Sequence, residues 1–165
     1  MTEQSELPAV PELPDLPERR QPILVAVNDS AAGFAAVEVA IEYAVRLGAH
    51  LAAVTVVESA IPALASVGED AATLAARRMR EADSILSHVV ARGARSGVTV
   101  TTHRRTGSVA AEILAEATAS GAGLLVIALV DKPSHAIPYI GSQTSRVLEF
   151  TTMPVLVVPV FRPGE

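Results

Sequence analysis

The stretch LLVIALVDKPSHAIPYIGSQTSRVLEFTTMPVLVVPV, residues 124–160, decides the fold class. Its two ends, LLVIALV and PVLVVPV, are continuous runs of aliphatic and β-branched residues rather than alternating ones. Such runs are typical of parallel strands whose faces are both covered by helices. Between them we expect a short helix from Gln143 to about Phe150, with Ser142 as its N-cap after Gly141. The segment therefore predicts a strand, a loop, a helix and a strand, and a helix N-terminus placed behind a strand is a natural anion site.

The preceding chain predicts three more strands, each followed by a helix. The first unit is a strand at 23–27, then a helix at 31–47 with Ser30 as N-cap and Gly48 as terminator. A strand at 51–57 precedes a long helix that ends near residue 95, with a capping box expected at Ser66 and Glu69. The segment from Val98 alternates as a half-exposed edge strand does, and a helix runs from 108 to about 120. Five strands alternating with four helices predict an α/β domain with a parallel sheet.

Three segments resemble the universal stress protein family. They are the opening ILVAVNDSAAGFAAVEVAIEYAVRLGAHLAAVTVVE, the segment TGSVAAEILAEATASGAGLLVIA, and the final strand, loop, helix and strand. In the family the last unit carries G-x-x-G, nine residues and then G-[ST]. This chain keeps the spacing, but Ala128 and Asp131 stand where the first two glycines are expected, before Gly141-Ser142. The resemblance covers roughly residues 22–160.

The resemblance implies a fold and a ligand crevice. The fold is a five-stranded parallel sheet of the adenine-nucleotide alpha hydrolase-like (Rossmann-like) type, with strand order 3-2-1-4-5 and helices on both faces. The crevice lies between the first and fourth strands, where the order reverses. In the family an Asp after the first strand contacts the nucleoside, and Asn28 matches that position. The candidate nucleotide-binding residues are Asn28, Asp29, Ala128, Asp131, Lys132, Gly141, Ser142, Gln143 and Thr144.

The phosphate end of this crevice departs from what a triphosphate needs. Ala128 adds a Cβ where close approach of backbone N–H groups is wanted, and Asp131 adds a negative charge. At an effective dielectric of about 20, one such carboxylate opposite one phosphate charge costs on the order of 3 kcal/mol. Pro133 and Pro138 remove two N–H donors, and Lys132 offsets part of the loss. We therefore expect a regulatory protein that acts through protein contacts, with ATP binding lost or weakened and no cofactor.

Two alternatives stay open at the crevice. The first is a universal stress protein that binds ATP or AMP, with Mg²⁺, through Asn28, Gly141, Ser142 and Thr144, with Lys132 on the phosphates. The second is a small nucleotide hydrolase, for which Asp29 and Asp131 are the candidate metal-binding carboxylates. Common nucleotide and hydrolase motifs are absent from the sequence, and so are cysteines. We expect no catalytic residue and no metal site.

Residues 1–22 form a proline-rich acidic tail ahead of the domain at 23–161, and residues 162–165 follow it. Prolines recur with a period of three, which matches the three residues per turn of polyproline II, and Leu or Val stands beside them. One interpretation is a solvating acidic tail; the other is a docking strap for a partner, such as a transporter or an enzyme. The residues of the expected strap are Leu7, Pro8, Val10, Pro11, Leu13, Pro14, Leu16 and Pro17.

Composition limits the partners. A net charge of −5 and a pI near 5.4 argue against a nucleic-acid partner, which needs a clustered basic face. No apolar run reaches the roughly 20 residues that span a bilayer, and the N-terminus lacks a signal-peptide pattern. We therefore expect a cytoplasmic protein without membrane insertion.

The last strand predicts a homodimer. MPVLVVPVF, residues 153–161, is apolar on both faces, yet the resemblance puts it at the edge of the sheet, where a bare apolar strand would promote aggregation. The resemblance implies that the last strands of two subunits pair antiparallel about a two-fold axis, which would cover this edge. The competing interpretation is that the N-terminal tail or a partner protein covers this edge. The expected interface residues are Val155, Val157, Pro159 and Phe161.

Overall fold

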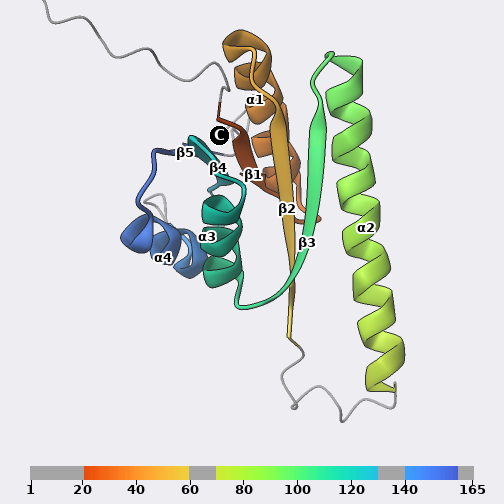
Figure 1. The fold of residues 1–165 in the computed structure, drawn as a ribbon. Coiled ribbons are helices and arrows are strands. Elements are labelled where there is room, and N and C mark those ends of the chain that lie inside the picture. The colour runs from red at the N-terminus through yellow and green to blue at the C-terminus, as the bar shows by residue number, and fades with distance from the viewer. Residues whose placement is uncertain (1–20, 60–69, 130–139, 160–165) are drawn as a thin grey trace, which may run out of the picture.

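The computed structural model describes residues 21–59, 70–129 and 140–159, which form one layered α/β unit (Figure 1). Strands and helices alternate along the chain, as the sequence predicts. The elements are β1 (Ile23–Ala26), α1 (Ala31–Leu47), β2 (Leu51–Glu58), α2 (Ala71–Arg95), β3 (Val100–Gly107), α3 (Val109–Ala119), β4 (Leu124–Ala128), α4 (Ser142–Phe150) and β5 (Val155–Val158).

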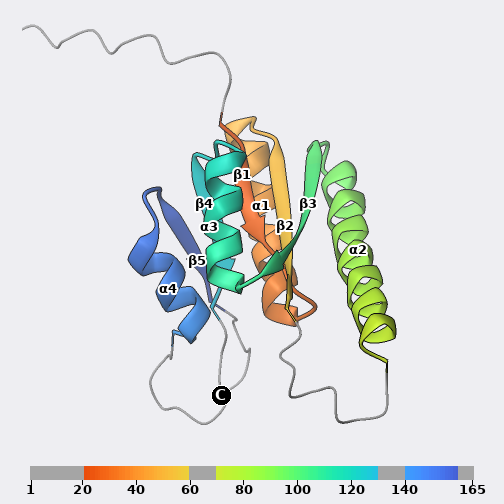
Figure 2. The same ribbon diagram turned by 60° about the horizontal axis from the view of Figure 1, so that its bottom comes forward.

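The five strands form one parallel sheet in the order β3-β2-β1-β4-β5, which confirms the expected fold. The order reverses between β1 and β4: β2 and β3 lie on one side of β1, and β4 and β5 lie on the other. β3 and β5 are the two edge strands, and each pairs with one neighbour among the described residues. The sheet has helices on both faces, α1 and α2 on one and α3 and α4 on the other (Figure 2).

Two apolar layers hold the helices to the sheet. Ile23 and Val25 of β1 face α1 and α2, whereas Leu24 faces α3 and α4. Because side chains alternate along a strand, one continuous aliphatic run supplies both layers. β1 and most of β2 and β4 are buried, as expected for strands covered on both sides.

Local signals fix most helix ends, with two differences from the sequence expectation. Ser30 caps α1 by accepting a hydrogen bond from the Gly33 N–H, and Gly48 ends that helix with φ of +59°. The expected cap Ser142 is wrong: Ser142 is the first residue of α4, and Gly141 is its N-cap without a side-chain bond. α2 has Asp70 as its N-cap, and the capping box expected at Ser66 and Glu69 lies outside the described residues.

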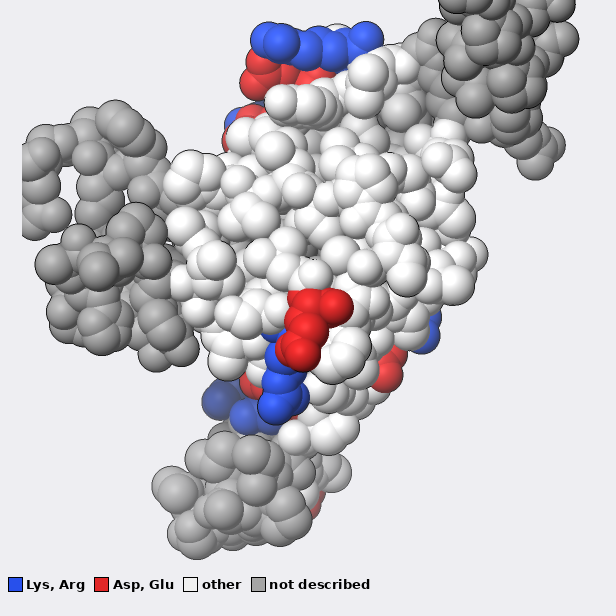
Figure 3. Space-filling model, turned by 90° about the vertical axis from the view of Figure 1, so that its left-hand side faces the viewer, with Lys and Arg blue, Asp and Glu red and all other residues white. Residues whose placement is uncertain are grey.

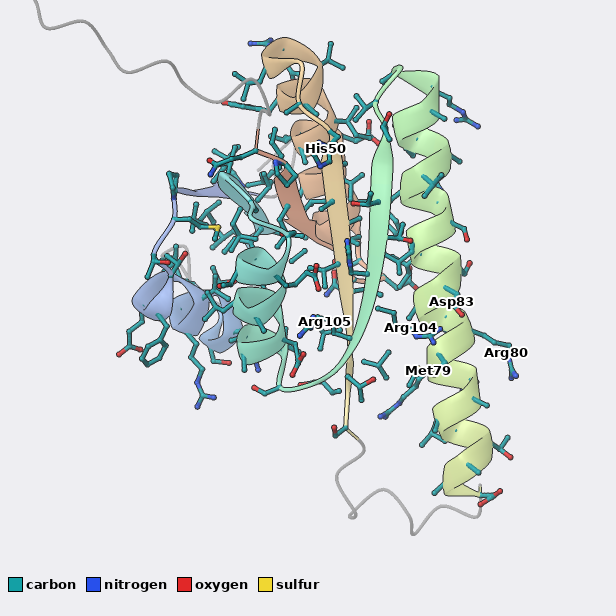
Figure 4. All side chains as sticks on the ribbon, in the orientation of Figure 1. His50, Met79, Arg80, Asp83, Arg104 and Arg105 are labelled. Carbon is teal, nitrogen blue, oxygen red and sulfur yellow. The ribbon has the colours of Figure 1, made fainter. Side chains whose placement is uncertain are left out.

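Edge strand β3 is charged on both of its faces, and Figure 4 shows Arg104 beside α2 and Arg105 on the α3 side. Arg104 pairs with Asp83 of α2 at 2.5 Å. Arg105 donates to Glu112 and Glu116 of α3 at 2.8 Å each, and His103 Nδ1 lies 3.1 Å from Glu116. Glu116 is only 3% exposed, so this pairing keeps a buried carboxylate satisfied.

Within the described residues, no helix is both long and apolar enough to cross a membrane. The docking strap expected at residues 7–17, and Phe161 of the expected interface, lie outside the described residues.

Candidate ligand cleft

A cleft of about 670 Å³ opens at the carboxyl ends of β1, β2 and β4, where the strand order reverses. This is the position at which open α/β sheets bind ligands, and the volume lies in the range of small-molecule sites. Its floor is apolar, and its polar side chains come from the turn after β1, from β2, and from helices α2 and α4. The lining residues used below are Asn28, Asp29, Thr55, Glu58, Arg78, Glu81, Ala128, Gln143 and Thr144.

Asn28 and Asp29 stand at the mouth of the cleft, as predicted. The Ser30 hydroxyl donates to Asn28 Oδ1 at 2.6 Å and itself accepts from the Gly33 N–H at 2.9 Å. Since the side-chain oxygen Oδ1 of Asn28 is already hydrogen-bonded within the turn, the side-chain N–H₂ group is the one left for a ligand. A Cβ at Gly33 would lie 2.5 Å from Asn28 Oδ1 and 2.7 Å from its backbone oxygen. The turn therefore depends on glycine at this position.

The α4 side of the cleft brings together part of the predicted set. Ala128 lines the cleft, and Thr144, 7% exposed, donates to the Ala128 backbone oxygen across a long 3.5 Å. Gln143 also lines the cleft, but its Oε1 accepts from the Ala110 N–H at 3.3 Å. Gln143 thus helps to satisfy the N-terminus of α3, whose own N-cap Ser108 makes no side-chain bond.

Of the remaining predicted residues, two are described and do not line the cleft, and two lie outside the described residues. Gly141 and Ser142 begin α4 beside the opening, and neither is among the residues that line it. Asp131 and Lys132, which the sequence places opposite the phosphates, lie outside the described residues.

The α2 side of the cleft was missed by sequence reasoning. Arg78 and Glu81 of α2 line the cleft, and Arg78 Nη1 lies 3.5 Å from the backbone oxygen of Glu58, at the end of β2. Charged residues on a solvent-exposed helix did not indicate a cleft, because the helical pattern does not show that this turn of α2 lies over the strand ends. Within the described lining, three carboxylates, from Asp29, Glu58 and Glu81, face one guanidinium.

Thr55 is a second cleft residue that was missed, and here a signal existed. It interrupts the apolar run LAAVTVVE of a strand covered on both faces. In the structure Thr55 is 4% exposed and lines the cleft. A polar residue inside such a strand indicates a place where the strand meets a cavity.

Among residues 21–59, 70–129 and 140–159, no group of three or more His, Asp or Glu side chains is arranged to hold a metal ion. Asp29 is exposed in the described turn.

The side of the molecule that carries α4 and β5 is almost free of charge (Figure 3). Charged atoms form a small group near its centre and otherwise lie at its margins. Val155 and Val157 are half-buried, Pro159 is exposed, and Phe150 at the end of α4 is 64% exposed. The expected interface residues that the structure describes therefore lie on an apolar edge.

Comparisons with known proteins agree with this geometry. The family model "Universal stress protein family" matches residues 19–159. A universal stress family protein from Burkholderia pseudomallei is 27% identical with a TM-score of 0.68, and the match covers 87% of this chain and 98% of that one. A universal stress protein from Lactobacillus plantarum is 26% identical with a TM-score of 0.66, covering 84% of this chain and 98% of that one.

A universal stress protein from Archaeoglobus fulgidus shares the fold with 20% identity and a TM-score of 0.65, covering 85% of this chain and 98% of that one. No curated protein sequence matches the chain significantly. The match to the family model, together with the strand order and the cleft at its reversal, leads to one conclusion: the chain belongs to the universal stress protein family.

Proposed function

We propose that this chain is a cytoplasmic, non-enzymatic regulatory protein that acts through protein contacts, with ATP binding lost or greatly weakened. The observation that carries the proposal is the side formed by α4 and β5, which is almost free of charge (Figure 3). An exposed strand edge that carries apolar side chains is typical of a protein-interaction site.

The cleft supports the second half of the proposal. Ala128 lines it where the family motif has glycine, and the described lining holds three carboxylates against one guanidinium. A phosphate chain would meet more negative than positive charge there, and like charges within a few ångströms oppose binding. ATP loses affinity on both counts.

Calorimetry with ATP and with AMP, and nucleotide analysis of the purified protein, test this proposal. We expect no nucleotide to co-purify and no ATP binding tighter than about 10 μM, or roughly 7 kcal/mol. Co-purified ATP, or a dissociation constant for ATP below about 10 μM, would contradict the proposal.

The second candidate function is ATP or AMP binding with Mg²⁺. It is favoured by the open cleft at the strand-order reversal, by the free amide of Asn28 and by the N-terminus of α4 beside the opening. The Archaeoglobus fulgidus neighbour was solved in complex with dAMP, and another universal stress protein with cAMP. The same titrations decide between the two candidates.

A nucleotide hydrolase is the least supported alternative, because it needs Asp29 and Asp131 to hold a metal ion. We expect Asp131→Asn to change no turnover. Magnesium-dependent ATP hydrolysis that this substitution abolished, in a protein of unchanged fold, would establish an enzyme instead.

We further propose a homodimer through β5, because, within the described residues, this strand leaves one edge unpaired and carries half-buried apolar side chains. Joining two such edges about a two-fold axis would cover both. Sedimentation at tens of micromolar, well above a dissociation constant of about 1 μM, should give the dimer mass. A monomer at that concentration would remove this interface.

The N-terminal tail is proposed to dock a partner, such as a transporter or an enzyme, through the apolar edge of residues 7–17. A pull-down that compares the full chain with a chain starting at Gln21 tests the idea. Partners retained only by the full chain are expected; identical partner lists would reduce the tail to a solvating appendage.

A further inference from the structure

We infer that the cleft selects its ligand by charge: it takes an uncharged small molecule of nucleoside size and rejects polyanions. Carboxylates on the α2 side, Glu58 and Glu81, are the determinants. The inference deepens the proposed loss of ATP binding and rests on it, because it names what the same cleft still accepts.

Size and polarity favour a small organic ligand. A cleft of about 670 Å³ with an apolar floor fits a molecule of a few rings, as small-molecule sites in proteins do. Two polar groups are available inside it. The Asn28 amide N–H₂ offers donors, since its oxygen accepts from Ser30 at 2.6 Å. Thr55, 4% exposed, lines the cleft, and its hydroxyl can both donate and accept.

Thr55 is the observation that points to a ligand rather than to a mere acidic surface. Thr55 lines the cleft, and no buried side-chain N or O atom among the described residues lacks a hydrogen-bond partner, so its hydroxyl is not a sealed, unsatisfied group. A ligand hydroxyl, carbonyl or ring nitrogen in the cleft can hydrogen-bond to it. Ala53, whose side chain lies on the same face of β2, is apolar and buried, so a polar residue at position 55 adds nothing to the core packing.

The charges around these groups decide which ligands enter. Asp29, Glu58 and Glu81 line the cleft, and Arg78 is the cation in its described lining. Arg78 is directed to the Glu58 backbone oxygen at 3.5 Å. Arg77 lies outside the lining and reaches Glu81 at 3.6 Å, with both side chains more than half exposed. Such an exposed contact neutralises little, so the described lining of the cleft stays net negative.

Adenosine, AMP and ATP are suitable probes, because they share a base and a sugar and differ in phosphate charge. With excess Mg²⁺ throughout, we expect wild-type protein to bind adenosine at least about tenfold more tightly than ATP. Higher ionic strength should narrow this ratio, since screening weakens interactions between exposed charges.

The decisive variant is Glu58→Gln/Glu81→Gln, which removes two charges and keeps the shape of both side chains. It should improve ATP affinity about tenfold and leave adenosine affinity unchanged. Glu38→Gln/Glu42→Gln on α1 is the matched control: it changes the net charge equally, outside the cleft, and should leave both affinities as they are. Thr55→Val should weaken adenosine and ATP alike.

The outcomes separate this inference from the proposed function. If neither adenosine nor ATP binds, the inference is wrong, whereas a regulatory role through protein contacts needs no ligand and stands. If ATP binds tighter than about 10 μM, both are wrong. If the cleft and control variants shift ATP affinity equally, overall charge is responsible, and selection by the α2 side is refuted.

Discussion

The two edge strands of the sheet differ in their side chains: β3 is charged and β5 is aliphatic. β3 carries His103, Arg104 and Arg105, which are held by carboxylates of α2 and α3. β5 carries four consecutive aliphatic residues, three of them half-buried, on a side of the molecule that is almost free of charge (Figure 3).

This difference indicates which edge strand is protected against pairing with another chain. An unpaired strand exposes backbone N–H and C=O groups to any other chain, and charged side chains along it deter such pairing. β3 has that protection, and α2 packs along it as well. Because β5 has neither charges nor a second strand beside it among the described residues, it is the edge for which we propose a partner.

The largest expected effect is loss of the proposed dimer in Val157→Asp. A charge placed on each of two facing β5 strands meets its own symmetry mate and must lose water as the strands join. We expect dimer affinity to fall at least about a hundredfold, measured by sedimentation equilibrium. Phe150→Asp, at a position already 64% exposed, tests the same surface without touching the packing of the sheet.

The matched control on the other edge is Thr102→Asp, at an exposed position of β3. It adds the same charge to an edge strand and should leave the mass of the assembly unchanged. A dimer lost in Thr102→Asp and kept in Val157→Asp and Phe150→Asp would reverse the assignment of the two edges.

Arg105→Met should give the largest stability loss among β3 variants, because it leaves the buried Glu116 carboxylate without its guanidinium. Hydrogen bonds to Glu112, and then to Glu116, raise the pKa of Arg105 above its ordinary value. A group whose pKa is raised by folding stabilises the fold fully at pH values below its pKa in the unfolded chain. This stabilisation is lost only as the pH rises through its pKa in the folded protein. The difference in Tm between wild type and variant should therefore stay constant from neutral to moderately alkaline pH.

A difference in Tm that shrank over this pH range would show that Arg105 is not the group responsible. Arg105→Met/Glu116→Leu should recover part of the loss, because the double variant removes both the buried charge and its partner. Failure to recover would assign the effect to the stem of Arg105 rather than to its charge.

Gly93→Ala tests how closely α2 covers β3. A Cβ at Gly93 would lie 2.3 Å from Val100 Cγ2 and 3.1 Å from the Val98 backbone oxygen. Alanine gains about 1 kcal/mol of helix propensity, but overpacking costs roughly 1–3 kcal/mol, so we expect a net loss in urea unfolding. Gly93→Ala/Val100→Ala should relieve the closer contact. A loss in free energy of unfolding for the double variant that exceeds the sum of the two single losses would contradict this packing.

The fold was predictable because its signals are local and repeated. The aliphatic runs, Ser30 with Gly48, and the alternation from Val98 give the elements within a few residues of their observed ends. The prediction of Ser142 as N-cap was wrong: serine is the stronger N-cap by preference, but glycine is also accepted there, and Gly141 takes the position in the structure.

The cleft was predictable only from one side. Asn28, Asp29 and Ala128 follow strand ends, so the topology brings them together once the strand order is known. Arg78 and Glu81 reach the cleft because α2 extends past those strand ends, a matter of helix placement that no periodicity records. The pairing of Arg105 with Glu116 was also hidden, since the basic cluster at 103–105 reads as solvated surface.

The smallest expected effect is that of Arg104→Met, the neighbour of Arg105 on the opposite face of β3. Its pair with Asp83 at 2.5 Å joins side chains that are 40% and 58% exposed. Exposed pairs contribute about 0.2–1 kcal/mol and are screened by salt, so the loss should be small and should vanish at high ionic strength. Urea unfolding at low and high salt measures it, with Asp83→Asn expected to match. A loss as large as that of Arg105→Met would mean that both faces of this edge carry stability, and that its charges hold the helices as well as deter other chains.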